Sequence, residues 1–435
     1  MRSSPRLRAA SPRGAARQAY AAATGVGGRG GTTVRIATYN ILSSALAPPA
    51  HFPGCRPEDL AASARLPRVL AKLAAEVDKN AVICLQEVSL SWAGACALDR
   101  LRAACYPMER GSARASPMTR FRCLAAGPLF AWFTERGYTF IPHFYGNPSN
   151  NYMGVRARGL RRCFCARSSV APPNKPSLFC VCFCQVGIAF RSSRYAAEGV
   201  DICRLSDTKP WPRPPKETGA RAWLKAQLTT GIVARMLQAL RRSQPAQDPW
   251  SYARGRFNAL VFLRLRDRET RGDFGVACYH MPCAYWAPPV MTIHAALAAQ
   301  RVAALAKDGL PYALAGDWNF TPTSPIYRLL TQGGEVPAGD PAAPVALPHD
   351  SWAARVDVPL MSAYAVAHGA EPEFTNHAVV RDQPPFIECL DYIFVSPTVE
   401  VLAADALPAK DEVKGPFPTA SEPSDHMLLA ATLRF

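Results

Sequence analysis

Apolar and polar positions follow two repeating patterns from Val34 onward, and these patterns predict the secondary structure. Short apolar runs predict strands at 34–42, 81–88, 186–190, 199–205, 257–265, 274–281, 312–318, 391–396 and 427–435. Apolar residues at helical spacing predict helices at 65–80, 220–242 and 290–307. Many strands combined with a few long helices predict an α+β domain of packed sheets that spans residues 34–435.

The composition indicates a globular protein, since 49% of the 435 residues are hydrophobic. Spanning a bilayer takes roughly 18 to 20 consecutive apolar residues. The longest apolar run, 178–190, is shorter and contains a Gln and a Gly. We therefore expect a soluble protein without a membrane span.

The first 33 residues differ from the rest in composition, with six Arg, no acidic residue, and many Ala, Ser and Gly. This composition is shared by organelle transit peptides and by plain disordered tails. We expect an intracellular protein, organellar if segment 1–33 is a transit peptide and otherwise cytoplasmic; the sequence does not decide between the two.

The formal net charge of +17 is concentrated in three segments. Residues 1–33, 95–126 and 155–185 carry +6, +4 and +6, which leaves +1 for the remainder of the chain. A general attraction to polyanions is therefore not expected from the body of the protein. An anionic substrate would have to be held by a specific site.

Segments 95–126 and 155–185 also hold eight of the fourteen cysteines. Cys180, Cys182 and Cys184 alternate with other residues, whereas zinc sites commonly use Cys pairs separated by two to four positions. Joining Gly154 to Val186 gives the continuous sequence NYMGVGIAF. We therefore predict that both segments are insertions outside the core, and hypothesise that 155–185 is a retained intron or mispredicted exon.

Polar residues recur at the ends of the predicted strands. They are Asn40, Glu87, His280, Asp317, Asn319, Asp391, Asp425 and His426. Any one of them could be a turn or cap residue, but together they supply carboxylates, amides and imidazoles to one rim. Oxygen ligands favour Mg²⁺ or Mn²⁺ over zinc. This combination of carboxylates, amides and imidazoles suits metal-assisted hydrolysis of a phosphate ester.

The motifs TYNIL, LQEV, YHM, GDWNF, DYIF and PSDH, in this order, resemble the endonuclease/exonuclease/phosphatase superfamily, which includes DNase I. The sequences LDYIFVS and EPSDH are most similar to those of the branch that contains the deadenylases, nocturnin, the angel proteins and 2′-phosphodiesterase. The resemblance implies a four-layer α/β/β/α sandwich of the DNase I-like type. The chain departs from deadenylase relatives at YHM and at Gln185-Val186-Gly187, which leaves the substrate open.

The resemblance also implies roles for individual residues. Glu87 would be the principal metal ligand, with Asn40 and Asp425 or Asp391 nearby. Asp317 would orient or deprotonate the attacking water, and Asn319 would bind that water or the phosphate. His426, oriented by Asp391, and His280 would contact the phosphate.

Two further residues, Asn258 and Trp286, are expected to bind the substrate. Asn258 lies where many relatives keep a polar residue. Trp286 and Trp318 flank proposed site residues and could stack a nucleobase, although Trp318 could equally pack in the core.

We therefore expect a Mg²⁺- or Mn²⁺-dependent phosphodiesterase. The first hypothesis is a nuclease of the 3′-exoribonuclease, deadenylase-like type, with RNA as the favoured substrate. Because the net charge outside the three basic segments is close to zero, a non-nucleic substrate such as a phosphoinositide, sphingomyelin or a dinucleotide is the second hypothesis. A catalytically inactive binding module is the third alternative.

Overall fold

The computed structural model describes residues 31–93, 127–144, 184–212, 248–348 and 350–435. The predicted helix at 220–242 lies outside these residues. So do nearly all of segments 1–33, 95–126 and 155–185, so their predicted nature stays a prediction. The last two residues of segment 155–185 belong to a strand that begins at Cys184.

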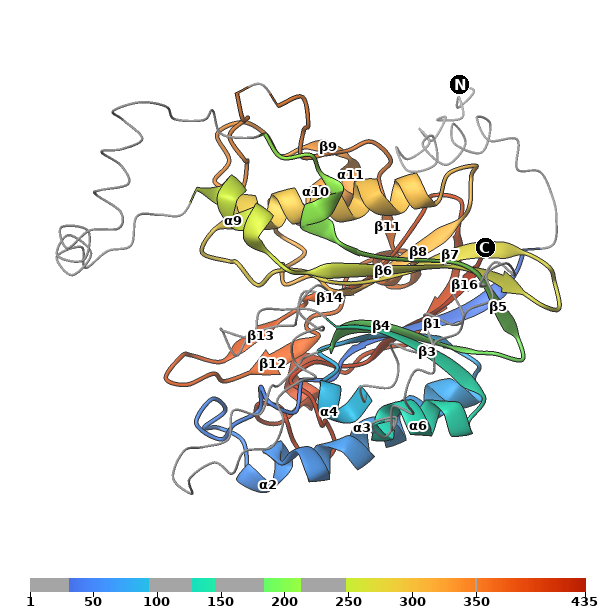
Figure 1. The fold of residues 1–435 in the computed structure, drawn as a ribbon. Coiled ribbons are helices and arrows are strands. Elements are labelled where there is room, and N and C mark those ends of the chain that lie inside the picture. Colours follow the sequence, from blue (N-terminus) through green and yellow to red (C-terminus); the bar gives the residue numbers. More distant parts are fainter. Residues whose placement is uncertain (1–30, 94–126, 145–183, 213–247, 349) are drawn as a thin grey trace, which may run out of the picture.

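Two six-stranded sheets lie face to face (Figure 1). The first has the order β15-β16-β1-β2-β4-β3 and consists of β1 (Thr33–Asn40), β2 (Val82–Gln86), β3 (Tyr138–Phe144), β4 (Cys184–Arg191), β15 (Glu400–Ala404) and β16 (Leu429–Arg434). The second has the order β11-β14-β8-β7-β6-β5 and consists of β5 (Tyr195–Arg204), β6 (Ala259–Asp267), β7 (Asp273–His280), β8 (Tyr312–Asp317), β11 (Met361–Ser362) and β14 (Asp391–Val395). Each strand predicted from the apolar runs is present.

Helices cover the outer faces of both sheets (Figure 1). The first sheet is covered by α3 (Ala62–Asp78), α4 (Leu90–Ala93) and α6 (Pro128–Glu135), and the second by α9 (Pro249–Gly255), α10 (Pro288–Leu305) and α11 (Pro325–Gln332). The short helix α2 (Pro57–Leu60) contacts α3. A further short helix, α12 (Ala363–His368), packs beside β14 and β15. The predicted four-layer α/β/β/α sandwich is confirmed.

The inner faces of the two sheets form one apolar core. At one end of the sandwich, the same faces of the strands carry polar residues. Side chains two residues apart in a strand share a face. Asn40, His280, Asp317 and Asp391 therefore share the inner face with core residues of the same strands, namely Ile36, Cys278, Ala315 and Ile393. His280 and Asp317 are partners in the parallel pair β7–β8, so the two strands end together.

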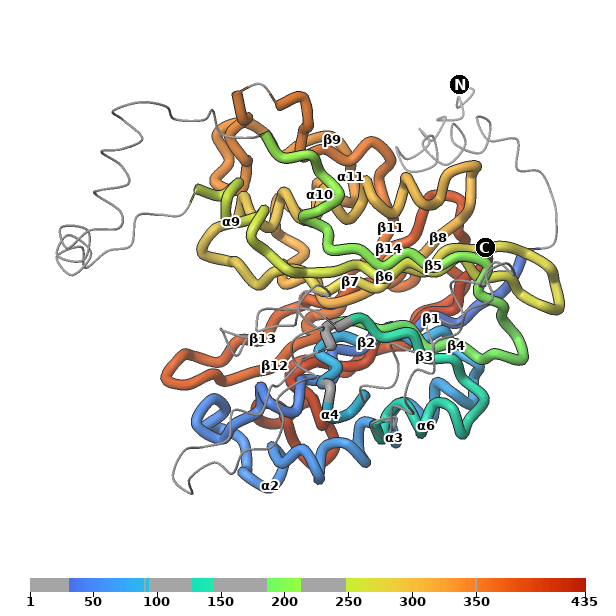
Figure 2. Tube along the Cα trace, in the orientation of Figure 1, coloured from blue at the N-terminus to red at the C-terminus, as the bar shows by residue number. Residues whose placement is uncertain are grey.

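Two short pairs complete the described fold, β9 (Gly334–Glu335) with β10 (Arg355–Val356), and β12 (Asn376–Ala378) with β13 (Phe386–Glu388). The β12–β13 hairpin projects from one end of the sandwich, where Asn376 forms a bridge to His426 (Figure 2). Short 3₁₀ segments lie at Leu205–Thr208 and Lys410–Glu412. Across the described residues, we find no helix with the length and apolar character required to cross a membrane.

Candidate active site

Tight turns at the strand ends place the polar side chains of the site. Glu87 follows β2 with a φ of 56°, and Asn319 follows β8 with a φ of 52°. Residues other than Gly seldom adopt this left-handed conformation, and it is concentrated at functional sites. The backbone N–H of Asn319 donates to Asp317 Oδ1 at 3.0 Å, which fixes the carboxylate within its own turn.

Asp317 lies at the centre of the site and is 1% exposed. Its Oδ2 accepts a hydrogen bond from Asn40 Nδ2 at 3.0 Å. The same oxygen lies 3.4 Å from His280 Nε2 and 3.6 Å from His426 Nε2. One carboxylate oxygen is thus shared by an amide and two imidazoles, which come from β1, β7 and the segment before β16.

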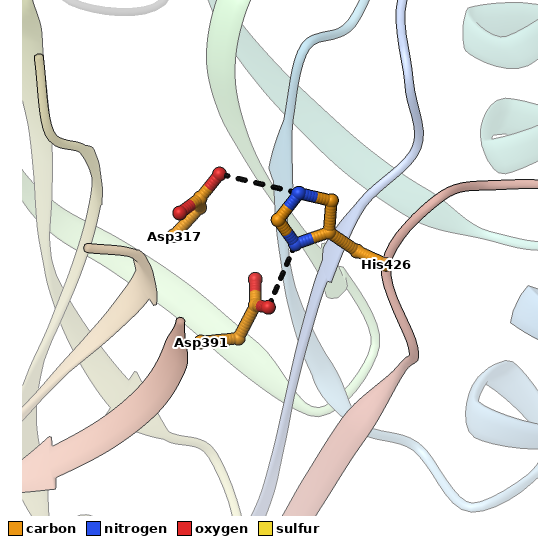
Figure 3. A group of neighbouring side chains, drawn as sticks. All are labelled: Asp317, Asp391 and His426. Atoms are coloured by element: carbon orange, nitrogen blue, oxygen red, sulfur yellow. Dashed lines mark hydrogen bonds and ion pairs between the residues drawn. The ribbon is translucent and has the colours of Figure 1, made fainter. Parts of the chain in front are cut away.

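His426 bridges two carboxylates (Figure 3). Its Nδ1 lies 2.8 Å from Asp391 Oδ2, which also accepts a hydrogen bond from Thr375 Oγ1 at 2.7 Å. Burial disfavours the charged imidazole, but Asp391 and then Asp317 outweigh it and raise the pKa of His426 well above its usual value. Burial likewise raises the pKa of Asp391, against the influence of His426. The pair therefore retains a proton between its members.

Glu87 is half-buried beside these groups. Its Oε1 lies 3.3 Å from Asn40 Nδ2, and its Oε2 accepts a hydrogen bond from the Ser43 N–H at 3.1 Å. Burial raises the pKa of Glu87, the charge of His280 acts against this rise, and the charge of Asp425 adds to it.

The donor set suits a hard divalent cation. Asp317, Asp391 and His426 offer ligand atoms that lie within 4.8 Å of one another. In that group, however, each His426 nitrogen already faces a carboxylate. Glu87 contributes its carboxylate oxygens alongside, whereas the Asn40 amide oxygen already accepts the Leu42 N–H at 3.0 Å. The buried Asp391 Oδ1 has no hydrogen-bond partner among the described residues. Oxygen donors of this kind fit Mg²⁺ or Mn²⁺.

The predicted substrate-binding residues fall into three different environments. Asn258 is 1% exposed and donates from Nδ2 to the His280 carbonyl at 2.8 Å, so it supports the end of β7. Trp286 is 60% exposed and forms an edge contact with Tyr285. Trp318 is fully buried against Tyr279, so of the two interpretations that the sequence left open for it, the structure supports packing in the core. Its neighbour Asp317 faces the site because side chains alternate across a strand end.

Two supporting residues were not foreseen from the sequence. Thr375 accepts the N–H of Leu390 at 2.9 Å and donates to Asp391, so it fixes that carboxylate. Ser424 donates to the Asn40 carbonyl at 2.6 Å and accepts the N–H of His426 at 3.3 Å. Ser424 lies in the PSDH motif and could have been suspected, but Thr375 has no local signal.

A sequence model of the Endonuclease/Exonuclease/phosphatase family matches residues 37–426. This match spans every residue of the site, from Asn40 to His426. It agrees with the resemblance found in the strand-end motifs.

Individual relatives match shorter parts of the chain. The 2′,5′-phosphodiesterase 12 of Mus musculus is 29% identical over 166 residues, which are 35% of this chain and 25% of the relative. Carbon catabolite repressor protein 4 homolog 4 of Arabidopsis thaliana is 34% identical over 122 residues, 27% of this chain and 25% of the relative. The chain thus matches about 25% of the length of these curated relatives.

Among solved structures, ANGEL2, a 2′,3′-cyclic phosphatase, in complex with adenosine-2′,3′-vanadate has a TM-score of 0.57 with this chain. Its sequence identity is 16%, and the superposition covers 93% of this chain and 96% of that chain. This similarity shows a common fold.

Proposed function

Because the chain belongs to the endonuclease/exonuclease/phosphatase family, we propose that it is a Mg²⁺- or Mn²⁺-dependent phosphodiesterase that hydrolyses nucleic acid, with RNA favoured. Within that class we propose a 3′-exoribonuclease of deadenylase-like type. The observation that carries the proposal is the arrangement of Asp317, which lies within 3.6 Å of two imidazoles, one of them held by Asp391.

Asp317 is suited to accept a proton from the attacking water. Its Oδ1 is fixed by the Asn319 N–H and its Oδ2 by Asn40, so the carboxylate cannot rotate freely. A positioned base of this kind contributes about 10²- to 10⁴-fold to a hydrolytic rate. Asn319 Nδ2 donates to the Met281 carbonyl at 3.0 Å, which leaves its amide oxygen for the water or the phosphate.

His426 and His280 would stabilise the negative charge that develops on the phosphoryl oxygens. Asp391 holds the Nδ1–H of His426, so its Nε2 carries the other proton when the imidazole is charged. Such preorganised donors stabilise a transition state because they need no reorientation during the reaction.

A divalent cation would be held by Glu87 and Asn40, with Asp425 close by. When bound, it supplies Lewis-acid polarisation of a phosphoryl oxygen and offsets the charge of the phosphate. The hydrogen bonds of Glu87 to Asn40 and Ser43 orient its carboxylate for this purpose.

Exposed aromatic rings in segments that lead from the site along the chain support a nucleic-acid substrate. Tyr285 and Trp286 are 75% and 60% exposed, and they follow His280 in the same connection. Phe386 is 47% exposed on β13, whose partner β12 contains Asn376, the residue that bridges to His426. Bases stack on such rings with a gain of about 1 to 3 kcal/mol each.

A substrate panel tests the proposal. Oligoadenylates with 3′,5′ and with 2′,5′ linkages, single-stranded DNA, and small phosphate esters would each be incubated with MgCl₂, with MnCl₂ and with EDTA. We expect metal-dependent release of mononucleotides from the 3′ end of RNA. Preferential cleavage of a 2′,5′ linkage would change the assigned linkage, and internal fragments would indicate an endonuclease.

The same panel examines the two alternatives. The charge of only +1 outside segments 1–33, 95–126 and 155–185 favours the non-nucleic phosphodiesterase as the second candidate. Turnover restricted to small esters such as a phosphoinositide, sphingomyelin or a dinucleotide would select it. Binding of RNA without hydrolysis under every metal condition would select the inactive binding module.

A further inference from the structure

Arg65 lies in α3 beneath the site, and its side chain is fully buried. Its Nε donates to the Pro423 carbonyl at 2.7 Å, and its Nη2 donates to the Ile41 carbonyl at 2.7 Å and also to the Leu42 carbonyl. All three acceptors are backbone oxygens. Among the described residues, no carboxylate lies within ion-pair distance of Arg65, and its Nη1 has no hydrogen-bond partner.

The three carbonyls belong to the two segments that carry the site. Ile41 and Leu42 follow Asn40 and lead to Ser43, whose N–H binds Glu87. Pro423 precedes Ser424, Asp425 and His426. The single guanidinium thus ties the end of β1 to the segment before β16, more than 350 residues away in the chain.

A second, independent contact joins the same two segments. Ser424 Oγ donates to the Asn40 carbonyl at 2.6 Å. Together the two contacts hold the backbone at Asn40 and at the two residues that follow it, and the Asn40 side chain in turn contacts Glu87 and Asp317. A shift of either segment would therefore move a proposed metal ligand relative to His426.

The charge of Arg65 is also related to the site. A buried cation without a paired anion is costly, and an apolar side chain of similar size could fill the same space. Burial lowers the pKa of Arg65, while the nearby carboxylates of Asp425 and Glu87 act in the opposite direction, as does Tyr39. The carboxylates of the site thus stabilise the buried cation, and the cation offsets their mutual repulsion in return.

We propose that Arg65 is a positioning residue of the active site, which holds the Asn40 segment and the Asp425–His426 segment in register through its hydrogen bonds to their backbone carbonyls. The predicted effect of Arg65 on the rate of hydrolysis rests on the proposed function. The predicted effect of Arg65 on the order of the two segments is independent of that function.

Arg65→Met removes all the donors and the charge but keeps an apolar side chain over the Trp92 ring, which the guanidinium faces at 5.4 Å. We expect kcat per folded molecule to fall about 10- to 100-fold, the range for residues that orient a reacting group, with KM nearly unchanged. Arg65→Lys, which keeps the charge and part of the hydrogen bonding, should recover a part of this loss.

Arg68→Met is the matched control. Arg68 lies on the same helix and contacts Asp59 and the Thr419 carbonyl, but its side chain is 31% exposed and it reaches neither site segment. Its kcat should stay close to that of the parent. A residue with only a stabilising role would lower the melting temperature and leave kcat per folded molecule intact.

Hydrogen exchange measured by mass spectrometry gives a readout that does not depend on turnover. In Arg65→Met we expect the amides of Leu42, Ser43 and His426 to exchange at least about 10-fold faster, while those inside β7 and β8 keep their rates. Unchanged exchange in both site segments together with an unchanged kcat would overturn the inference.

The exchange comparison still decides the inference if the parent protein hydrolyses none of the substrates, so failure of the proposed function is recognised separately. If Arg65→Met does not fold, Arg65→Gln, which retains an amide donor without the charge, is judged by the same two criteria.

Discussion

Asp317 and Asp391 are direct partners across the antiparallel pair β8–β14, and each of their carboxylates faces one nitrogen of the His426 imidazole (Figure 3). Two acids that the sheet register places opposite each other would repel if both were charged and alone. The imidazole between them removes this conflict by holding a proton. The relationship also explains why the pKa of His426 is raised.

Changing Asp391 to Asn should weaken both catalysis and the proton affinity of His426. The amide cannot accept the Nδ1–H in the same way as a carboxylate, and kcat should fall by about 10²-fold or more. Nuclear magnetic resonance titration of the His426 ring should show a lower pKa than in the parent.

The pH dependence of stability follows from the same pair. The folded state raises the pKa of His426 above its ordinary value of 6.5, so it binds a proton more tightly than the unfolded chain. The resulting stabilisation is complete below about pH 6.5 and is lost as the pH rises through the folded pKa. Urea unfolding from about pH 6 to 9 should therefore show a falling free energy of unfolding, with a smaller fall in Asp391→Asn. Equal slopes in both proteins would contradict this prediction.

Glu87→Gln should abolish the response to divalent cations. Saturating MgCl₂ or MnCl₂ should raise the melting temperature of the parent by a few degrees, since about 100-fold excess over Kd contributes ~2.7 kcal/mol. Loss of a charged ligand should remove most of this shift and lower kcat about 10²-fold or more. Glu400→Gln, at an exposed pair with Arg434, is the control. A full metal-induced shift in Glu87→Gln would assign the cation to other residues.

Gly316→Ala should disturb the strand that presents Asp317. Gly316 has a φ of 153°, and a Cβ there would lie 1.8 Å from the Tyr279 carbonyl oxygen in the neighbouring strand. We expect the free energy of unfolding to fall by roughly 3 kcal/mol or more in chemical denaturation. Gly309→Ala also has a positive φ, 76°, but open space around it, and should cost only about 1 kcal/mol. Similar losses in both variants would exclude the steric explanation.

Trp286→Ala should weaken binding of oligonucleotides without affecting stability, because the ring is 60% exposed. Loss of one stacked base costs about 1 to 3 kcal/mol, which corresponds to an increase in KM of roughly 5- to 150-fold. The KM for a small phosphate ester should stay the same. Val345→Ala removes an 83% exposed apolar side chain from a different loop and is the control. An unchanged KM for RNA would remove Trp286 from the substrate site.

Local sequence patterns were sufficient for most of the two main sheets but missed β3, β11 and β15, each of which lies at the edge of its sheet. Short apolar runs bounded by polar residues identified the central strands, because those strands are buried on both faces. β3 contains Pro142 and is the outermost strand of its sheet, and β15 lies at the opposite edge. Edge strands tolerate proline and carry a weaker apolar pattern, so they are harder to predict.

The sequence by itself determined the α+β class with packed sheets and the polar residues at the strand ends, because burial and the two-residue period of a strand are local properties. The four-layer sandwich followed from the resemblance of its motifs to the family. Only the tertiary structure decided that Asp391 faces Asp317 through His426, that Trp318 is core while Trp286 is exposed, and that Arg65 is buried beneath the site. These relationships join residues far apart in the chain. They depend on the register between strands and on the stacking of the sheets, which no single segment of sequence contains.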